Sequence, residues 1–153
     1  MNAATRTPFR NACTTAGLAL CLVLLPSTAP ALEVPVLLGD VGVGKLVPDM
    51  RAELRALLRD ELAVADFAQV KTREHFVLSA TLTRLDSVVA SDSVRATCVV
   101  SVALLRDRGA TLHAVIHGRA TAEEAKAQVD AAQIDALRAA VHSAIARVPQ
   151  ALR

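Results

Sequence analysis

The glycine-rich segment from Gly39 to Lys45 has the residue types of a phosphate-binding loop. Its sequence, Gly-Asp-Val-Gly-Val-Gly-Lys, fits the first seven positions of the motif that holds nucleotide phosphates on backbone amides. The eighth position of that motif needs a Ser or Thr hydroxyl for magnesium, and here it is Leu46. Pro48 lacks a backbone amide near the place where the phosphates would lie. We therefore expect a glycine-rich turn between a strand and a helix, and no nucleotide partner.

The imidazoles of the chain belong to His75, His113, His117 and His142. His113 and His117 are expected on one face of one strand, four residues and roughly 13 Å apart. That separation is too large for a shared metal ion, because metal–nitrogen bonds are only about 2 Å long. No Ser, Cys or Asp forms a recognisable catalytic triad motif with them. We expect solvated surface histidines, and no catalytic, cofactor-binding or metal-binding residue.

Two further features have a structural interpretation as well as a functional one. Cys98 is the only thiol after residue 31, and it falls on the apolar face of a predicted strand, where thiols pack and rarely react. Arg51, Arg55 and Arg59 recur every four residues along a predicted helix. An acidic partner could use this row, but we expect a solvated helix face.

The beginning of the chain has the three parts of a secretory signal peptide. Arg6 and Arg10 make a positive start without acids, and the segment 16–25 is an apolar run of about ten residues. Ala29-Pro-Ala31 offers small residues for a signal peptidase. The run is shorter than the roughly 20 residues of a spanning helix, although an uncleaved anchor is the alternative. Cys21 lies inside the run, which does not fit a lipoprotein signal.

These observations divide the chain into a cleavable signal peptide, residues 1–31, and a single domain, residues 32–153. We expect an exported protein, periplasmic or extracellular, without a transmembrane span in its mature form. Removal of Arg6 and Arg10 from the 17 cations leaves 15, which equals the 15 acids. A neutral domain without Trp or Tyr offers neither the cation excess nor the stacking platforms of nucleic-acid binding.

Alternating hydrophobicity predicts three strands between His75 and Ala120, with the even-numbered residues forming the apolar face of each. Residues 87–93 are expected to form a loop or a frayed strand end. Because paired residues share a face, the second hairpin needs paired numbers with an even sum. A three-residue loop from Asp107 to Gly109 meets this condition, and it pairs Leu104 with Leu112 and Val100 with Ile116.

Two helices and two shorter strands complete the prediction. Residues 34–38 are predicted as a strand, and residues 67–71 as a second, short one. The first helix follows Pro48, and the last helix opens at a capping box, at Thr121–Glu124 or at Asp130–Gln133, and ends at Pro149. The apolar stripe of the first helix comprises Met50, Leu54, Leu57, Leu58, Leu62 and Ala65; that of the last comprises Ile134, Leu137, Val141, Ala144, Ile145 and Val148.

The element order predicts an α+β fold, a two-layer sandwich. We expect a mainly antiparallel sheet of three to five strands, with two helices packed on one face and the other face open. The open face carries the odd-numbered residues, with an apolar centre around Val99 and Val115. The predicted face comprises Val77, Thr81, Arg95, Thr97, Val99, Ser101, Ala103, His113, Val115 and His117.

The pattern from Phe76 to Val148 resembles a group of small bacterial envelope domains. These are the α/β modules of the curli-secretion lipoprotein, the outer-membrane activators of peptidoglycan synthases, and the N-terminal part of TolB. The resemblance lies in Phe-Val-Leu-Ser-Ala-Thr-Leu-Thr, then Ala-Thr-Cys-Val-Val-Ser-Val-Ala-Leu-Leu, then Gly-Arg-Ala-Thr-Ala, and finally the Ala-rich closing helix from Ala136. It implies a non-enzymatic envelope module and assigns no site residue.

The sequence therefore predicts an exported, non-catalytic binding or assembly module of the bacterial cell envelope. Its partner is expected to be another envelope protein, or a second copy that binds through the outward sheet face. Two alternatives stay open at this point: a carrier of a small apolar ligand between sheet and helices, and an enzyme with an unrecognised site.

Overall fold

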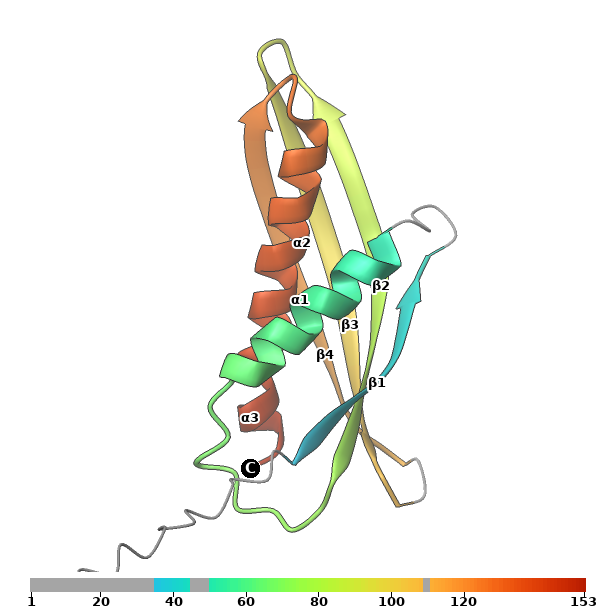
Figure 1. Cartoon of the computed structure of the whole chain (residues 1–153). Helices are drawn as coiled ribbons and strands as arrows, with labels where there is room; N and C mark the ends of the chain where they lie inside the picture. The colour runs from blue at the N-terminus through green and yellow to red at the C-terminus, as the bar shows by residue number, and fades with distance from the viewer. Residues whose placement is uncertain (1–34, 45–49, 109–110) are drawn as a thin grey trace, which may run out of the picture. The chain divides into compact units, whose positions relative to one another are not determined.

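The computed structural model describes residues 35–44, 50–108 and 111–153 (Figure 1). The predicted signal peptide, residues 1–31, lies outside these residues, as do Lys45, Leu46, Pro48 and Gly109. The elements are, in chain order, β1 (Val36–Val43), α1 (Arg51–Val64), β2 (Phe76–Val89), β3 (Ser93–Arg106), β4 (Leu112–Ala125), α2 (Val129–Ile145) and α3 (Val148–Ala151).

The strands form one four-stranded sheet in the order β1-β2-β3-β4. Strands β2, β3 and β4 are an antiparallel meander of 14-residue strands, while β1 pairs with β2 in parallel. Helices α1 and α2 cover one face of this sheet, which confirms the predicted α+β architecture (Figure 1). None of the helices in the described part of the chain combines the length and the apolar character that a membrane crossing requires.

The core lies between the sheet and the two helices, and the strand periodicity explains it. In β3 every even-numbered residue from Val94 to Leu104 is fully buried, as the alternation predicts. Helix α1 buries Leu54, Leu57, Leu58 and Leu62, and α2 buries Leu137, Val141, Ala144 and Ile145 along the predicted stripes. Ile134 is only partly buried, because Ala132 and Ala136 face the sheet in its place.

Helix α2 lies tightly against β4 at Gly118. A Cβ atom at this position would overlap the carbonyl oxygen of Ala140 and lie 2.9 Å from the Ala144 Cβ. Small residues on the helix, Ala136 and Ala140 among them, are fully buried beside it. The absence of a side chain at Gly118 therefore sets the distance between the two layers.

Strand β1 corrects the prediction for the glycine-rich segment. Gly39 and Gly42 lie within the strand, which pairs with β2 from Val36 to Val43 with a bulge between Leu38 and Val41. The expected turn is therefore wrong from Gly39 to Val43. A glycine inside a strand often marks a bulge, where the regular ladder of backbone hydrogen bonds is locally disrupted.

The predicted short strand over residues 67–71 is also wrong. This segment belongs to the connection between α1 and β2, where the Ala68 amide donates to the Asp66 carboxylate and the Val70 amide donates to the Phe67 carbonyl. Local side-chain and backbone bonds of this kind favour a turn over a ladder. Phe67 nevertheless packs into the core, with 8% of its surface exposed.

Residues 87–93 are mostly strand rather than loop. Strand β2 continues to Val89, and β3 begins at Ser93, with the turn confined to the residues between them. A bulge between Leu82 and Arg84 reverses the parity of β2, so that Leu85 pairs with Cys98 on the helix side. The even-numbered rule therefore holds in β2 only as far as Leu82.

The second hairpin has the predicted even parity in its main part but a different register. Leu104 pairs with Ala114 and Val100 with Gly118, where the three-residue loop predicted Leu112 and Ile116. The connection from Asp107 to Thr111 is longer than expected, and a bulge between Leu104 and Leu105 places Leu112 opposite Leu105. Leu112 is therefore 56% exposed instead of joining the core.

Neither capping box opens the last helix. Residues 121–124 belong to β4, which continues to Ala125, and α2 begins at Val129 with Gln128 at its N-cap and no side-chain cap bond. Gln133 instead donates to the Ser87 hydroxyl of β2. Pro149 does not end this helix either, since α2 stops at Ile145 and Pro149 lies in the first turn of α3.

Candidate functional site

The four histidines lie in four different environments. His75 is exposed in the connection directly before β2. His142 of α2 contacts the Glu61 carboxylate of α1 at 2.8 Å, and His117 is exposed on the open sheet face. His113 lies at the β4 bulge, where its ring contacts the Ala151 carbonyl at 3.0 Å and stands 5.0 Å from the Phe76 ring. The prediction that His113 shares the open face with His117 is therefore wrong, because the bulge turns His113 towards α3.

The described residues contain no group of three His, Cys, Asp or Glu side chains arranged to hold a metal ion. Cys98 is fully buried on the helix side of β3, as its strand position predicts. Burial away from water raises the pKa of Cys98 to about 12, because the thiolate loses its hydration there. At neutral pH this thiol is protonated and packs as a small apolar side chain.

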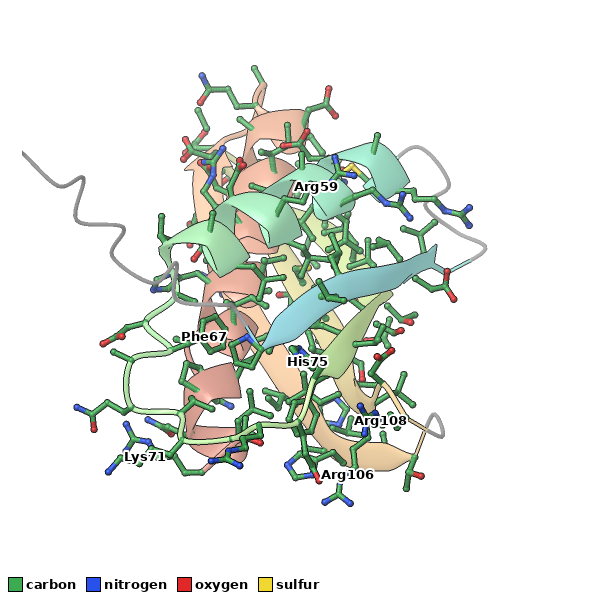
Figure 2. All side chains as sticks on the ribbon, turned by 60° about the horizontal axis from the view of Figure 1, so that its bottom comes forward. Arg59, Phe67, Lys71, His75, Arg106 and Arg108 are labelled. Carbon is green, nitrogen blue, oxygen red and sulfur yellow. The ribbon has the colours of Figure 1, made fainter. Side chains whose placement is uncertain are left out.

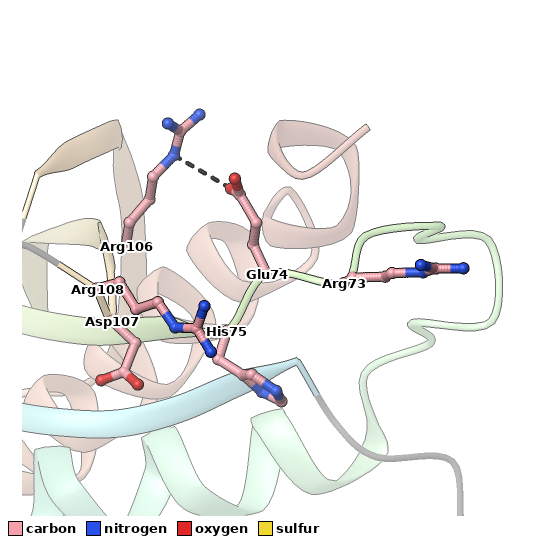
Figure 3. Close-up of a pocket in the computed structure, with 6 residues that line it drawn as sticks. All are labelled: Arg73, Glu74, His75, Arg106, Asp107 and Arg108. Carbon is pink, nitrogen blue, oxygen red and sulfur yellow. Dashed lines mark ion pairs between the residues drawn. The ribbon is translucent and has the colours of Figure 1, made fainter.

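A basic cavity opens where the connection before β2 meets the end of β3. Its volume is about 320 Å³. The backbone amide of Asp107 donates to the His75 carbonyl at 2.9 Å and joins the two segments. Figure 3 shows Arg106 extended towards Glu74, while the Arg73 side chain points away from the others. The lining residues are Arg73, Glu74, His75, Arg106, Asp107 and Arg108.

The charges around this cavity are unevenly matched. Arg106 and Glu74 form an ion pair at 3.2 Å, and both side chains are about half exposed. Among the described residues, neither Arg73 nor Arg108 takes part in an ion pair. An adjoining cavity of about 530 Å³ adds Lys71 to the same end of the sheet. We call the four residues Lys71, Arg73, Arg106 and Arg108 the basic end. Figure 2 labels Lys71, Arg106 and Arg108, which lie at a distance from Arg59 of α1.

The open face of the sheet carries an apolar row near this end. Leu37, Val77, Leu105 and Leu112 are successive partners across all four strands. Leu37 is 58% exposed and Leu112 is 56% exposed. The next row towards the middle adds Ala103 and its partner Val115, which is 47% exposed.

Val99 is not part of an apolar centre, contrary to the prediction. It lies between its partners Arg84 and Arg119, so cations flank it on both sides. Farther along, Arg95 donates to Glu123. This bond, with a second from the Ser93 hydroxyl, lowers the pKa of the Glu123 carboxyl below its usual value. The open face thus changes from apolar to charged along the strands.

The arginine row of α1 has the position that the sequence predicts. Arg51, Arg55 and Arg59 are exposed on the side of the helix that faces away from its buried leucines.

The basic end, in contrast, is not predicted from the sequence. Its cations lie in two segments more than thirty residues apart, and only the pairing of β2 with β3 brings them together. The one available signal was the clustering of cations at both predicted strand ends.

Comparisons with known proteins agree with the fold. No protein-family model matches the chain, and no curated protein does. Among solved structures, a DUF330-family protein from Xanthomonas campestris aligns with a TM-score of 0.50 at 15% identity, over 76% of this chain and 84% of that protein. A hypothetical protein from Chlamydia trachomatis gives a TM-score of 0.49 at 13% identity, over 76% of this chain and 96% of its own.

A minor lipoprotein from Acinetobacter baumannii aligns with a TM-score of 0.48 at 12% identity, over 78% of this chain and 94% of that protein. At such identities a likeness concerns the fold alone, and we base the comparison on the Xanthomonas protein. It supports the four-stranded sheet with two helices on one face.

Proposed function

We propose that this protein is an exported, non-catalytic binding or assembly module of the bacterial cell envelope. The observation that carries the proposal is the apolar row of Leu37, Val77, Leu105 and Leu112 on the open face of the sheet. The export signal predicted for residues 1–31 and the resemblance to envelope modules support the location. The partner is another envelope protein or a second copy of this chain.

The apolar row has the properties of a contact surface. A sheet with one face in water normally alternates apolar residues inside with polar residues outside. Here the outside positions of one cross-strand row are all apolar, and the two edge leucines are more than half exposed. Contiguous exposed apolar side chains on a folded domain are typical of protein–protein interaction sites.

The charged surroundings suit such a surface as well. Arg106 and Asp107 border the row at the strand ends, beside a shallow cavity of about 220 Å³ that Val77 and Leu105 also line. An apolar centre with a polar rim is the usual anatomy of a protein interface. The partner would be recognised by apolar side chains that cover the row, with polar groups at its border.

Photo-cross-linking in the native host tests the proposal. A photo-reactive amino acid in place of Leu112 should form a discrete adduct with an envelope protein or with a second copy. The same residue in place of Arg59, on the helix side, serves as the control. Identical adducts from both positions, or none from position 112, would remove the support for the sheet face as the contact surface.

Cell fractionation of the same strain tests the location separately. The protein should be recovered from the periplasm or the medium. Recovery in the cytoplasm only would contradict the envelope part of the proposal, whatever the cross-linking shows.

A further inference from the structure

We propose that the basic end docks onto a bilayer surface that carries anionic phospholipids. This inference goes beyond the proposed function, because it assigns the domain an orientation relative to the bilayer. That orientation does not depend on which partner the open sheet face binds. The basic end comprises Lys71, Arg73, Arg106 and Arg108, all of them exposed.

The basic end is spread over a surface and does not line a groove. Lys71 and Arg73 come from the connection between α1 and β2, and Arg106 and Arg108 come from the end of β3 and the turn after it. Figure 2 shows Lys71, Arg106 and Arg108 distributed across this end of the domain. A planar anionic surface can engage several such cations at once.

The charge of this end is only partly neutralised by the protein itself. Glu74 and Asp107 are the carboxylates that line its cavity, and Glu74 is engaged with Arg106. Within the described ranges Lys71, Arg73 and Arg108 take part in no ion pair. Their long side chains therefore remain available to lipid phosphates.

The opposite end of the meander has the other sign. The Lys126 amide donates to the Asp92 carbonyl and brings the end of β4 beside the turn between β2 and β3. Asp92, Glu124 and Asp130 gather there with one Lys side chain, while Arg84–Asp86 and Arg95–Glu123 neutralise each other. A domain with this polarity is turned by a negatively charged plane so that its basic end faces the plane.

The Phe76 amide donates to the Pro35 carbonyl at 2.8 Å, so the described chain begins beside the basic end. In this orientation the strands would lead away from the bilayer. The apolar row would lie close to the bilayer on the open side of the sheet, because Val77 and Leu105 line the same shallow cavity as Arg106.

Vesicle co-sedimentation of the exported protein, recovered from its native host, tests the docking. The protein should bind vesicles with roughly 30% phosphatidylglycerol in phosphatidylethanolamine, and should not bind vesicles of phosphatidylcholine alone. Binding should weaken as salt rises towards about 0.5 M, where the screening length falls well below 8 Å. Anionic vesicles that do not sediment the protein at low salt would overturn the proposal.

Charge reversal shows which surface binds. Arg73→Glu with Arg108→Glu should lower the affinity for anionic vesicles at least about thirtyfold, since each cation near the surface contributes roughly fivefold and the new carboxylates add repulsion. Arg55→Glu with Arg59→Glu changes the net charge equally on α1 and should have a much smaller effect. Equal losses in both double variants would assign the binding to net charge and overturn a role of the basic end.

Three readouts keep the outcomes separate. Circular dichroism melting should show that both double variants fold, because all four arginines are exposed and unpaired among the described residues. Binding of soluble polyglutamate with the same dependence on Arg73 and Arg108, but no binding to anionic vesicles, would replace the membrane with an acidic protein partner. Loss of vesicle binding with intact cross-linking from position 112 would overturn the docking and leave the proposed function in place.

Discussion

At the scale of single residues, the close contact between Gly118 and Ala140 limits what the two layers tolerate. The obstacle to a side chain at Gly118 is a backbone carbonyl oxygen of α2, which cannot rotate away. Any relief requires the whole helix to shift from the sheet. Such overpacking in a rigid core costs about 1–3 kcal/mol.

Gly118→Ala should therefore lower the free energy of unfolding by about 2 kcal/mol or more. Gly44→Ala is the matched control, because a Cβ there would make only an ordinary contact, 3.6 Å from the Leu82 carbonyl oxygen. Urea unfolding followed by circular dichroism measures both. Similar stabilities for the two variants would show that the helix lies farther from β4 than described.

Cys98 gives a second residue-scale prediction, this one about pH. Burial raises its pKa from 9.0 to about 12, so between these values the unfolded chain releases a proton that the folded chain keeps. Stability should then fall as pH rises above about 9, and Cys98→Ala should weaken this dependence. Thiol labelling should be slow in the native protein and fast in urea; rapid native labelling would contradict the burial.

At the scale of elements, β3 is the strand that most constrains the fold, because it pairs on both sides and buries one face completely. The adjacent residues Val99 and Val100 of β3 point to opposite faces of the sheet. Val100 is fully buried, while Val99 lies partly exposed between Arg84 and Arg119. The two positions therefore report the orientation of the whole strand.

Val100→Glu should unfold the domain or cost several kcal/mol, since it buries a carboxylate without a partner. Val99→Glu should change stability by only about 1 kcal/mol or less, because the new carboxylate faces two arginines across the strands. Thermal unfolding compares the variants. If both unfold alike, the outer face is covered and the two-layer arrangement is wrong.

The sequence predicted β3, α1 and the layer arrangement because each depends on hydrophobic periodicity, which is a local signal. It misplaced the hairpin register by two residues, since the bulge at Leu104 and Leu105 leaves no mark in the alternation. It offers Thr121–Glu124 and Asp130–Gln133 as alternative starts of the last helix, and neither is correct. A capping box and a strand end with polar residues look alike before the pairing partner is known.

The candidate surfaces were harder to predict than the elements. The apolar row depends on the register of three strand pairs, so an error in one pair removes Leu112 from it. The basic end depends on which strand ends meet, and cations in separate segments give no periodic signal. The open face itself followed from the odd-numbered residues of β3.

At the scale of the whole molecule, export and processing remain predictions. Mass spectrometry of protein recovered from the periplasm or medium should give an N-terminus at or within a few residues of Leu32, after cleavage behind Ala31. Intact Met1 or Arg6 on the exported form would contradict cleavage and favour an uncleaved anchor. Fusion of residues 1–31 to a reporter enzyme provides the control for export alone.

The parallel pairing of β1 has a consequence for the order in which the domain acquires structure. Strands β2, β3 and β4 form hairpins between neighbours in the chain, whereas β1 must wait for α1 and the following connection before it meets β2. Closing that longer loop costs more chain entropy and slows folding. A chain that crosses a membrane from its N-terminus presents β1 first and pairs it late. During that interval the side of β2 that later receives β1 is an unpaired strand edge, which is a template for pairing with another chain.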